Sequence, residues 1–268
     1  MNSTIQKKYR EMSETLSPKS VKNIHGVLHK ALDQAIKSGL IKSNPSDGCE
    51  LPKIEKSDIK PMSDEQSNAF LAAIKGHPYE VLYKTALFTG LRECEILGLK
   101  WDCVDFEKGS ILVDKQLRKR HEKGGEYYYT PPKNGKSRTI NPAPFVMNML
   151  KAHKVQQTEQ RLKCGPVWEN SGLVFTTDTG GHLYVNTVFN RFKRIVTAIG
   201  CPDVRFHDLR HTYAVNSIRA GDDIKTIQGN LGHATAAFTL NVYGHFTNEM
   251  KQDSASRMDD FAKTKFNL

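Results

Sequence analysis

The chain has 268 residues, of which 38% are hydrophobic and 25% are charged. This length can bury a hydrophobic core without a stabilising disulfide or metal, and this composition excludes a mostly disordered chain. There is no run of about 18 apolar residues and no apolar signal core near the start, so we expect neither a membrane span nor secretion. Lysine and arginine number 39 against 29 aspartate and glutamate, and the net charge of +10 favours a polyanionic partner, nucleic acid first and an acidic membrane surface second.

The five cysteines are scattered along the chain and form no C-x-x-C pair. Neither a disulfide framework nor a zinc finger is expected from such spacing, and reduced thiols are typical of a cytosolic protein. We therefore expect no metal site and no cofactor that depends on these cysteines.

Helical signals dominate the first hundred residues. Ser17 and the proline after it form an N-cap and a first turn, and Gly39 ends the apolar pattern that follows. Residues 44–61 lose this periodicity and are rich in proline, which predicts a linker. Ser63 and Gln66 then have the spacing of a capping box. The predicted helices of this part cover residues 18–38, 63–75, 78–90 and 92–98.

The middle of the chain carries β-strand signals. Residues 110–117, 126–130 and 137–140 are short β-rich runs separated by glycine and proline turns, which predicts a small antiparallel sheet of hairpins. Helical periodicity then returns. The predicted helices of this part cover about residues 143–163, 186–199, 207–220, 223–230, 235–243 and 248–264. The expected fold class is therefore mainly α with a small antiparallel β-sheet (α+β).

The first of three polar interruptions in these helical runs lies in residues 89–97. Gly90 permits a sharp turn that places Arg92 near a helix N-terminus, where an anion is favoured. The alternative is that Arg92 only pairs with Glu95, three residues further on.

The second interruption is at residues 206–212. His207 and Arg210 share a helix face, so a phosphate held by Arg210 would have His207 beside it as a proton carrier. His207 and His211 also have the spacing of a zinc-binding pair, but Asp208 stands where that motif has glutamate and no clear third ligand follows. A surface helix without chemistry remains the third alternative.

The third interruption runs over residues 231–245. Tyr243 lies at the end of a predicted helix beside a glycine, and His233 directly follows Gly232. Packing of the tyrosine ring and capping of a helix by the histidine are the alternatives to a chemical role.

Together these segments resemble the tyrosine recombinases. The stretch TGLRECEILGLKWDCVDF resembles the first box of that family, and RFHDLRHTYAVNSI with IQGNLGHATAAFTLNVYGH resembles the second. The resemblance covers about residues 60–246 and points to the integrases of phages and of integrative and conjugative elements. Phe238 departs from it, because a small or hydroxylated residue is common there. The catalytic set that the resemblance implies is Arg92, Lys133, His207, Arg210, His233 and the nucleophile Tyr243.

The resemblance implies site-specific DNA recombination through a covalent 3′-phosphotyrosine. This intermediate keeps the energy of the phosphodiester, so rejoining needs no ATP, metal or other cofactor. Arg92 and Arg210 would clamp the non-bridging phosphate oxygens, because planar guanidinium groups suit the charge that develops there. His207 would act as the base and His233 would donate a further hydrogen bond to the phosphate.

A lysine in the turn between the second and third strands would protonate the leaving 5′-oxygen. Lys133 fits this role better than Lys136. The other basic side chains would either follow the DNA backbone or form a solvated face. They are Lys115, Arg118, Lys119, Arg120, Lys136, Arg138, Arg191, Lys193 and Arg194.

The resemblance also divides the chain. Residues 1–57 would be a partial helical core-binding (DNA-binding) segment with its linker, without a separate arm-site-binding domain. Residues 58–268 would be the catalytic domain with a C-terminal tail helix, and the tail from Asn248 would dock on a neighbouring protomer or pack on its own domain.

The partners implied are double-stranded DNA, further copies of the chain in a homotetramer assembled on DNA, and accessory directionality proteins, with no membrane. The implied location is the bacterial cytoplasm, at the nucleoid when DNA is bound. A type IB topoisomerase-like enzyme and a catalytically silent DNA-binding regulator remain the alternative functions.

Overall fold

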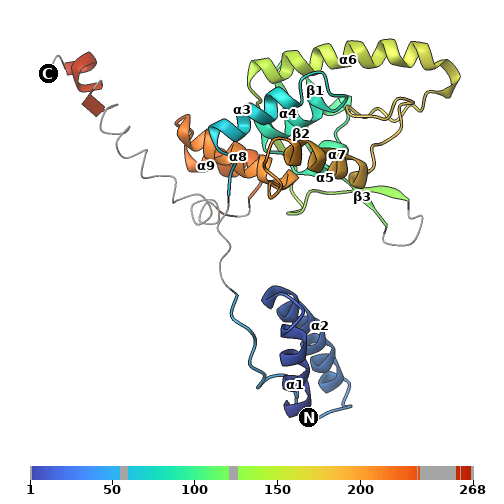
Figure 1. Cartoon of the computed structure of the whole chain (residues 1–268), viewed down its shortest axis with the longest axis vertical. Helices are drawn as coiled ribbons and strands as arrows, with labels where there is room; N and C mark the ends of the chain where they lie inside the picture. Colours follow the sequence, from blue (N-terminus) through green and yellow to red (C-terminus); the bar gives the residue numbers. More distant parts are fainter. Residues whose placement is uncertain are drawn as a thin grey trace. The chain divides into compact units, whose positions relative to one another are not determined.

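The computed structural model describes residues 2–54, 60–120, 126–233, 235, 258–259 and 261–266. The chain forms two compact units, Met1–Asp58 and Ile59–Leu268, which we call the N-terminal and C-terminal units (Figure 1). None of the helices that the structure describes has the length and apolar character needed to cross a membrane.

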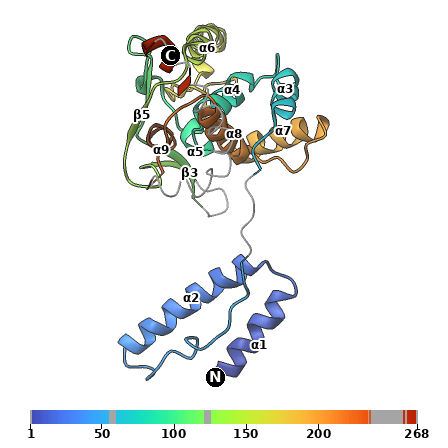
Figure 2. The ribbon, with the colours of Figure 1, turned by 90° about the vertical axis from the view of Figure 1, so that its left-hand side faces the viewer.

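The N-terminal unit contains two helices, α1 (Asn2–Ser13) and α2 (Pro18–Lys37), which lie side by side (Figure 2). Helix α2 begins as predicted, because the Ser17 side chain accepts a hydrogen bond from the backbone N–H of Ser20 (3.2 Å). Helix α1 was not predicted from the sequence, because its residues are mostly polar. Tyr9 fixes it to α2, since its ring is buried and its hydroxyl lies 3.1 Å from Nδ1 of His25.

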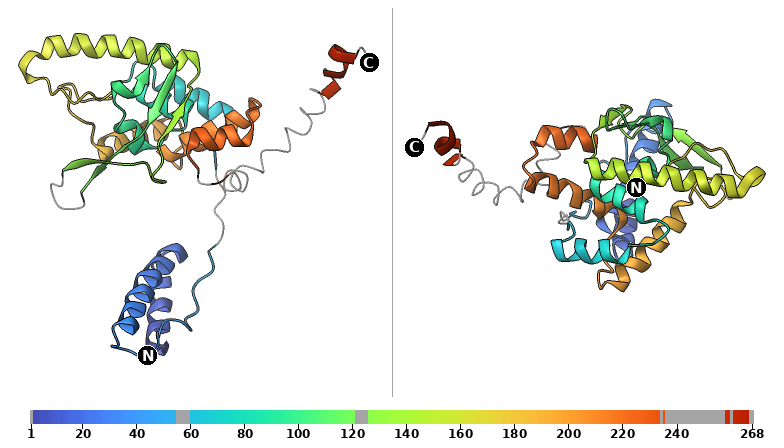
Figure 3. Two further views of the ribbon diagram at one scale, coloured as in Figure 1. Left: turned by 180° about the vertical axis from the view of Figure 1, so that it is seen from behind. Right: turned by 90° about the horizontal axis from the view of Figure 1, so that it is seen from above.

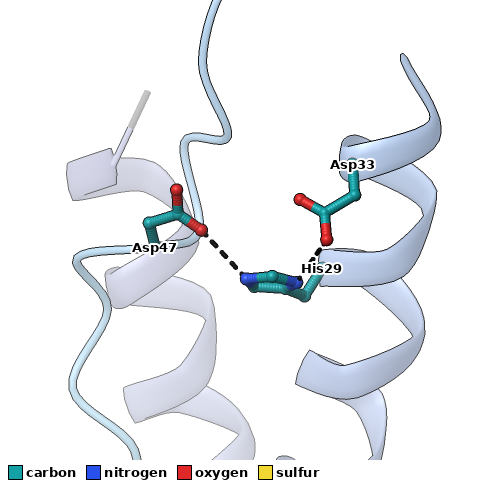
Figure 4. Close-up of side chains that lie close together, drawn as sticks. All are labelled: His29, Asp33 and Asp47. Atoms are coloured by element: carbon teal, nitrogen blue, oxygen red, sulfur yellow. Dashed lines mark ion pairs between the residues drawn. The ribbon is translucent and has the colours of Figure 1, made fainter. Parts of the chain in front are cut away.

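The first residues of the predicted linker belong to this unit instead. Asn44 is buried, and its amide donates to the backbone oxygen of His29 (3.1 Å) and to Asp33 Oδ1 (2.7 Å). The His29 ring lies between two carboxylates, with Nδ1 3.2 Å from Asp33 and Nε2 2.9 Å from Asp47 (Figure 4). Each carboxylate faces a different ring nitrogen, so the imidazole joins α2 to the segment that follows it.

The C-terminal unit is mainly helical with two small antiparallel sheets, which confirms the predicted fold class. Its α-helices up to residue 233 are α3 (Asp64–Ala73), α4 (Glu80–Thr89), α5 (Glu93–Leu97), α6 (Pro144–Cys164), α7 (Val185–Ala198), α8 (Phe206–Arg219) and α9 (Ile224–Leu231). The 3-10 turns are η1 (Trp101–Cys103) and η2 (Gly165–Val167). The strands are β1 (Val104–Asp105), β2 (Ser110–Val113), β3 (Gln116–Lys119), β4 (Tyr127–Thr130) and β5 (Arg138–Ile140).

The prediction of one sheet of hairpins is wrong in its pairing. The run 110–117 divides into β2 and β3, which belong to different sheets of order β1-β2-β5 and β3-β4. Strand β2 pairs with β5, so that Ile111 lies opposite Ile140 in the core. Strand β3 instead packs close to α5. Gly98 caps the C-terminus of α5, and a Cβ atom added there would lie only 2.8 Å from the backbone nitrogen of Leu117. The chain switches sheets because these two apolar faces lie against different parts of the core.

Helix α4 forms the centre of the core and packs against α6 and α8. The centroid of its Tyr83 ring lies 6.0 Å from the ring centroid of Phe70 (α3), 5.8 Å from that of Phe192 (α7) and 6.2 Å from that of Phe206 (α8). The long helix α6 covers one side of this core (Figure 3). Its buried residues Val146, Met147 and Leu150 lie in its first half. This aromatic packing fixes the start of α8 relative to the first half of α4.

Helix α4 ends at Gly90, whose φ of +62° is left-handed, and a Cβ there would lie 2.4 Å from the Tyr213 ring and 2.7 Å from Leu231. Gly76 has a similar φ of +74° but open space around it, which makes it a matched control. We expect Gly76→Ala to lower the free energy of unfolding by about 1 kcal/mol through backbone strain alone. Gly90→Ala should lower it by about 3 kcal/mol, because overpacking is added. Denaturant unfolding followed by tryptophan fluorescence measures both, and equal losses would contradict the close packing at Gly90.

Candidate active site

The C-terminal end of α9 is the point at which the candidate residues meet. The last carbonyl groups of a helix lack partners within it, and its negative dipole end attracts cations. Here they accept hydrogen bonds from three arginines, which come from the start of α5, from β5 and from α8. The pairs are Arg138 Nε with Asn230 O (2.8 Å), Arg210 Nη2 with Leu231 O (2.5 Å) and Arg92 Nη2 with Gly232 O (3.2 Å).

Arg92 is the N-cap residue of α5 and is held by Glu95 one turn later. Its Nη1 lies 2.8 Å from Glu95 Oε1 and its backbone N–H donates to Oε2 (2.9 Å). The pairing considered from the sequence is thus confirmed. It does not bury the guanidinium, which stays 19% exposed and reaches the Gly232 oxygen with Nη2.

Glu95 is fully buried and receives two further hydrogen bonds from Arg138. Arg138 Nη1 donates to Oε1 (3.0 Å) and Nη2 to Oε2 (2.7 Å), so each carboxylate oxygen has two donors. Burial alone would raise the pKa of this carboxyl group, but the hydrogen bonds and charge of Arg138, and then those of Arg92, lower it to about 2. Glu95 is therefore a carboxylate at neutral pH and fixes two guanidinium groups.

Arg210 is buried on α8, at 2% exposure. Its Nη1 donates to the backbone oxygen of Gly90 (2.7 Å), at the end of α4, and its Nη2 donates to that of Leu231. Two helix ends thus fix the plane of its guanidinium group, as a bidentate contact to an anion requires.

Three histidines lie around these arginines. The rings of His207 and His211 meet edge to face, with centroids 4.8 Å apart, and His233 follows the left-handed Gly232. Loss of hydration and the charge of Arg210 lower the pKa of His207. Burial and then neighbouring His207 lower the pKa of His211 to about 4, and burial with Arg210 and Arg92 lowers that of His233 to about 3. All three rings are therefore neutral at pH 7, and a neutral ring carries one donor and one acceptor nitrogen.

The zinc interpretation of His207 and His211 gains no support from the described part of the chain. Within those ranges, one group of three side chains is close enough to hold a metal ion, and it is His29, Asp33 and Asp47 of the N-terminal unit.

Lys133 and Lys136 both lie exposed in the turn between β4 and β5. Asn134 ties this turn to the site, because its amide donates to the backbone oxygen of Gly232 (2.8 Å), which Arg92 also contacts. The structure thus brings the lysine turn next to Arg92 and His233. Tyr243, Phe238 and all of the predicted helix 235–243 except Thr235 lie outside the described residues.

Arg138 and Asn134 are site residues that the sequence analysis missed. Arg138 was assigned to the DNA backbone or to a solvated face, but its side chain is 11% exposed and bonded to protein. Glu95 was considered only as a partner of Arg92. Its capping-box spacing, three residues after Arg92, was the available signal.

The neutral histidines give a pH prediction. An unfolded histidine binds a proton near pH 6.5, whereas His211 and His233 stay neutral in the folded unit down to about pH 4 and 3. The unfolded state then binds more protons, so the free energy of unfolding should fall as pH falls below about 6.5, by at most about 1.4 kcal/mol per pH unit per histidine. His233→Gln should reduce this slope. Denaturant unfolding at pH 7.5, 6.5, 5.5 and 4.5 measures the slope. The same slope in His233→Gln as in the parent would contradict a neutral His233 in the folded unit.

Comparison with known proteins identifies the family of the chain. The sequence profile of the phage integrase family matches residues 59–250. A tyrosine recombinase XerC-like protein of Caldanaerobacter subterraneus subsp. tengcongensis is 32% identical over 96% of this chain and 70% of its own length. The ICEBs1 integrase of Bacillus subtilis is 28% identical over 93% of this chain and 67% of its own length.

Solved structures share the fold. The Tn1549 transposon integrase in complex with transposon right end DNA has a TM-score of 0.79 and 24% identity, over 96% of this chain and 85% of that one. A lambda integrase dimer bound to a COC′ core site has a TM-score of 0.64 and 18% identity, over 89% and 80%. The profile match and the 32% identity together show that the chain belongs to the phage integrase family of tyrosine recombinases.

Proposed function

We propose that this chain is a site-specific DNA recombinase, the integrase of a mobile genetic element, and that it cleaves and rejoins DNA strands through Tyr243. The observation that carries the proposal is the meeting of Arg92, Arg210 and His233 with the Lys133 turn at the end of α9. Family membership supplies the substrate class, because the Tn1549 and lambda integrases were solved bound to DNA.

The two arginines are suited to hold a scissile phosphate. Attack by a tyrosine oxygen raises the charge on the non-bridging oxygens, and fixed guanidinium donors stabilise that charge. Arg92 and Arg210 are oriented by protein carbonyls and by Glu95 without any contribution from DNA. A guanidinium has five N–H groups, and Arg92 uses two of them in its contacts with Glu95 and Gly232, so donors remain for a phosphate.

The proton transfers fall to His207 and a lysine. A tyrosine hydroxyl has an ordinary pKa of about 10 and needs a base at neutral pH. His207 is neutral, as a base must be, because loss of hydration and the charge of Arg210 lower its pKa. Lys133 protonates the leaving 5′-oxygen, and the anchored Asn134 directly after it favours Lys133 over Lys136. His233 donates to the phosphate.

The reaction uses no metal or cofactor, because the 3′-phosphotyrosine conserves the energy of the cleaved bond. Residues 1–57 act as a partial core-binding segment on double-stranded DNA, and residues 58–268 act as the catalytic domain. Four copies assemble on DNA, accessory proteins set the direction, and the protein works in the bacterial cytoplasm.

Tyr243→Phe tests the nucleophile, with Tyr128→Phe as the matched control, since Tyr128 is an exposed tyrosine of β4. On a nicked suicide duplex carrying the joined ends of the element that encodes the chain, the parent and Tyr128→Phe should form a covalent protein–DNA adduct. Tyr243→Phe should bind the duplex but form none, because only the hydroxyl is lost.

Three other outcomes of that assay point elsewhere. An adduct with Tyr243→Phe would overturn the nucleophile assignment. No adduct with the parent protein would favour the silent DNA-binding regulator. An adduct without joining of strands from two duplexes would favour a type IB topoisomerase-like enzyme.

The tail provides a test of assembly. Met258, Phe261 and Phe266 are 66%, 50% and 65% exposed, so these apolar side chains have surface to bury against another protomer. Deletion from Asn248 onward should leave the affinity for a single half-site within about twofold and weaken cooperative binding to paired half-sites at least tenfold, a loss of about 1.4 kcal/mol. Gel-shift titrations on both duplexes measure this. Unchanged cooperativity would show that the tail packs on its own domain.

A further inference from the structure

We propose that Arg138 is a positioning residue for strand cleavage. It fixes the positions of Arg92 and of the C-terminal end of α9 relative to the turn that carries Lys133. The inference rests on the proposed function. It concerns a residue of β5 that contacts α5 and α9 and has no place among the phosphate-clamping and proton-transferring groups described above.

Every nitrogen of the Arg138 guanidinium has a protein acceptor. Nη1 and Nη2 bind the two oxygens of Glu95 at 3.0 and 2.7 Å, and Nε binds the backbone oxygen of Asn230 at 2.8 Å. The side chain is 11% exposed, so it is poorly placed to follow a DNA backbone. A planar fork with a third donor at its base suits this geometry, and a lysine ammonium group would not reproduce it.

Glu95 transmits the effect of Arg138 to Arg92. The carboxylate is fully buried and divides its four hydrogen bonds equally between Arg92 and Arg138. Without Arg138, half of these donors are lost, and a buried carboxylate with too few donors takes up a proton more readily. A protonated Glu95 would hold Arg92 weakly, so the Arg92 guanidinium would lose its fixed orientation.

Arg138 also supports the segment that carries His233. A Cβ built on Gly232 would lie 2.9 Å from Arg138 Nη1 and 3.1 Å from its Cδ, so the turn after α9 rests directly on the Arg138 side chain. Asn134, in the turn just before β5, donates to the Gly232 oxygen. The segment from Asn134 to Arg138 therefore contacts the end of α9 twice, once on each side of Lys136, and sets the lysine turn against His233.

The experiment compares Arg138→Met and Arg138→Lys with Arg219→Met. Arg219 of α8 is a matched control, because it also binds a carboxylate with both Nη atoms (Asp64, 2.8 and 3.0 Å) but lies outside the site. Single-turnover cleavage of the suicide duplex at saturating protein gives the rate. Gel shifts give the DNA affinity, and tryptophan fluorescence reports folding.

We expect Arg138→Met to bind DNA within about threefold of the parent and to cleave about 100-fold more slowly, the usual cost of a small misplacement of catalytic groups. Arg138→Lys should recover part of the rate, because it keeps the charge but not the fork. Arg219→Met should cleave like the parent. Removing Arg138 in a Glu95→Gln background should cost much less than in the parent, since the two residues act through one contact.

The pH profile separates positioning from a general loss of structure. With Arg138 gone, the Glu95 carboxyl group takes up its proton at higher pH, so the acid side of the cleavage profile should move to higher pH. The Glu95→Gln and Arg138→Met double variant should lack this displacement. If Arg138→Met does not fold, the cleavage rate and the pH profile of Arg138→Lys are compared with those of Arg219→Met instead.

Two results would overturn the inference. One is cleavage by a folded Arg138 variant at the rate and with the pH profile of Arg219→Met. The other is a loss of cleavage explained by weaker DNA binding, which would make Arg138 a phosphate contact. Absence of an adduct with the parent protein would instead overturn the proposed function, so the two failures are distinguishable.

Discussion

The buried carboxylate of Glu95 is the constraint on which the site depends. A charge removed from water must be paired and hydrogen-bonded, and here four N–H groups of Arg92 and Arg138 satisfy it. Because those arginines come from the start of α5 and from β5, one charge fixes two elements of different kinds. Arg210 adds a third guanidinium group at the end of α9, where it donates to the backbone oxygens of Gly90 and Leu231 rather than to Glu95. The excess positive charge favours an anion and contributes, after burial, to the low pKa of His233.

Two helix ends aim the guanidinium groups. Gly90 at φ +62° and Gly232 at φ +61° end α4 and α9 in left-handed turns, and their carbonyl oxygens accept from Arg210 and from Arg92. A left-handed residue lets the chain leave the helix sharply while the last carbonyls stay available. The negative end of each helix therefore orients the guanidinium group that it contacts.

Local signals in the sequence predict helices α2 to α9, but neither helix α1 nor the pairing of the strands. The caps at Ser17 and Ser63 involve partners three residues away, and both were predicted correctly. The division of 110–117 between two sheets was not predicted, because it depends on which distant apolar surface each half covers. Arg138 was misassigned for the same reason. Its partners Glu95 and Asn230 are 43 and 92 positions away, and its own neighbours in the chain give no sign of either.

Contacts between distant parts of the chain orient the arginines of the site. Arg92, Arg138 and Arg210 come from segments that tertiary packing alone brings together, and each is held by hydrogen bonds that form on folding. The entropy lost in ordering these long side chains is part of the folding free energy. In the function that we propose, a phosphate that enters the site meets donors already oriented for the charge of the transition state. Its binding energy need not be spent on arranging them, which is the condition under which fixed dipoles and charges accelerate a reaction most.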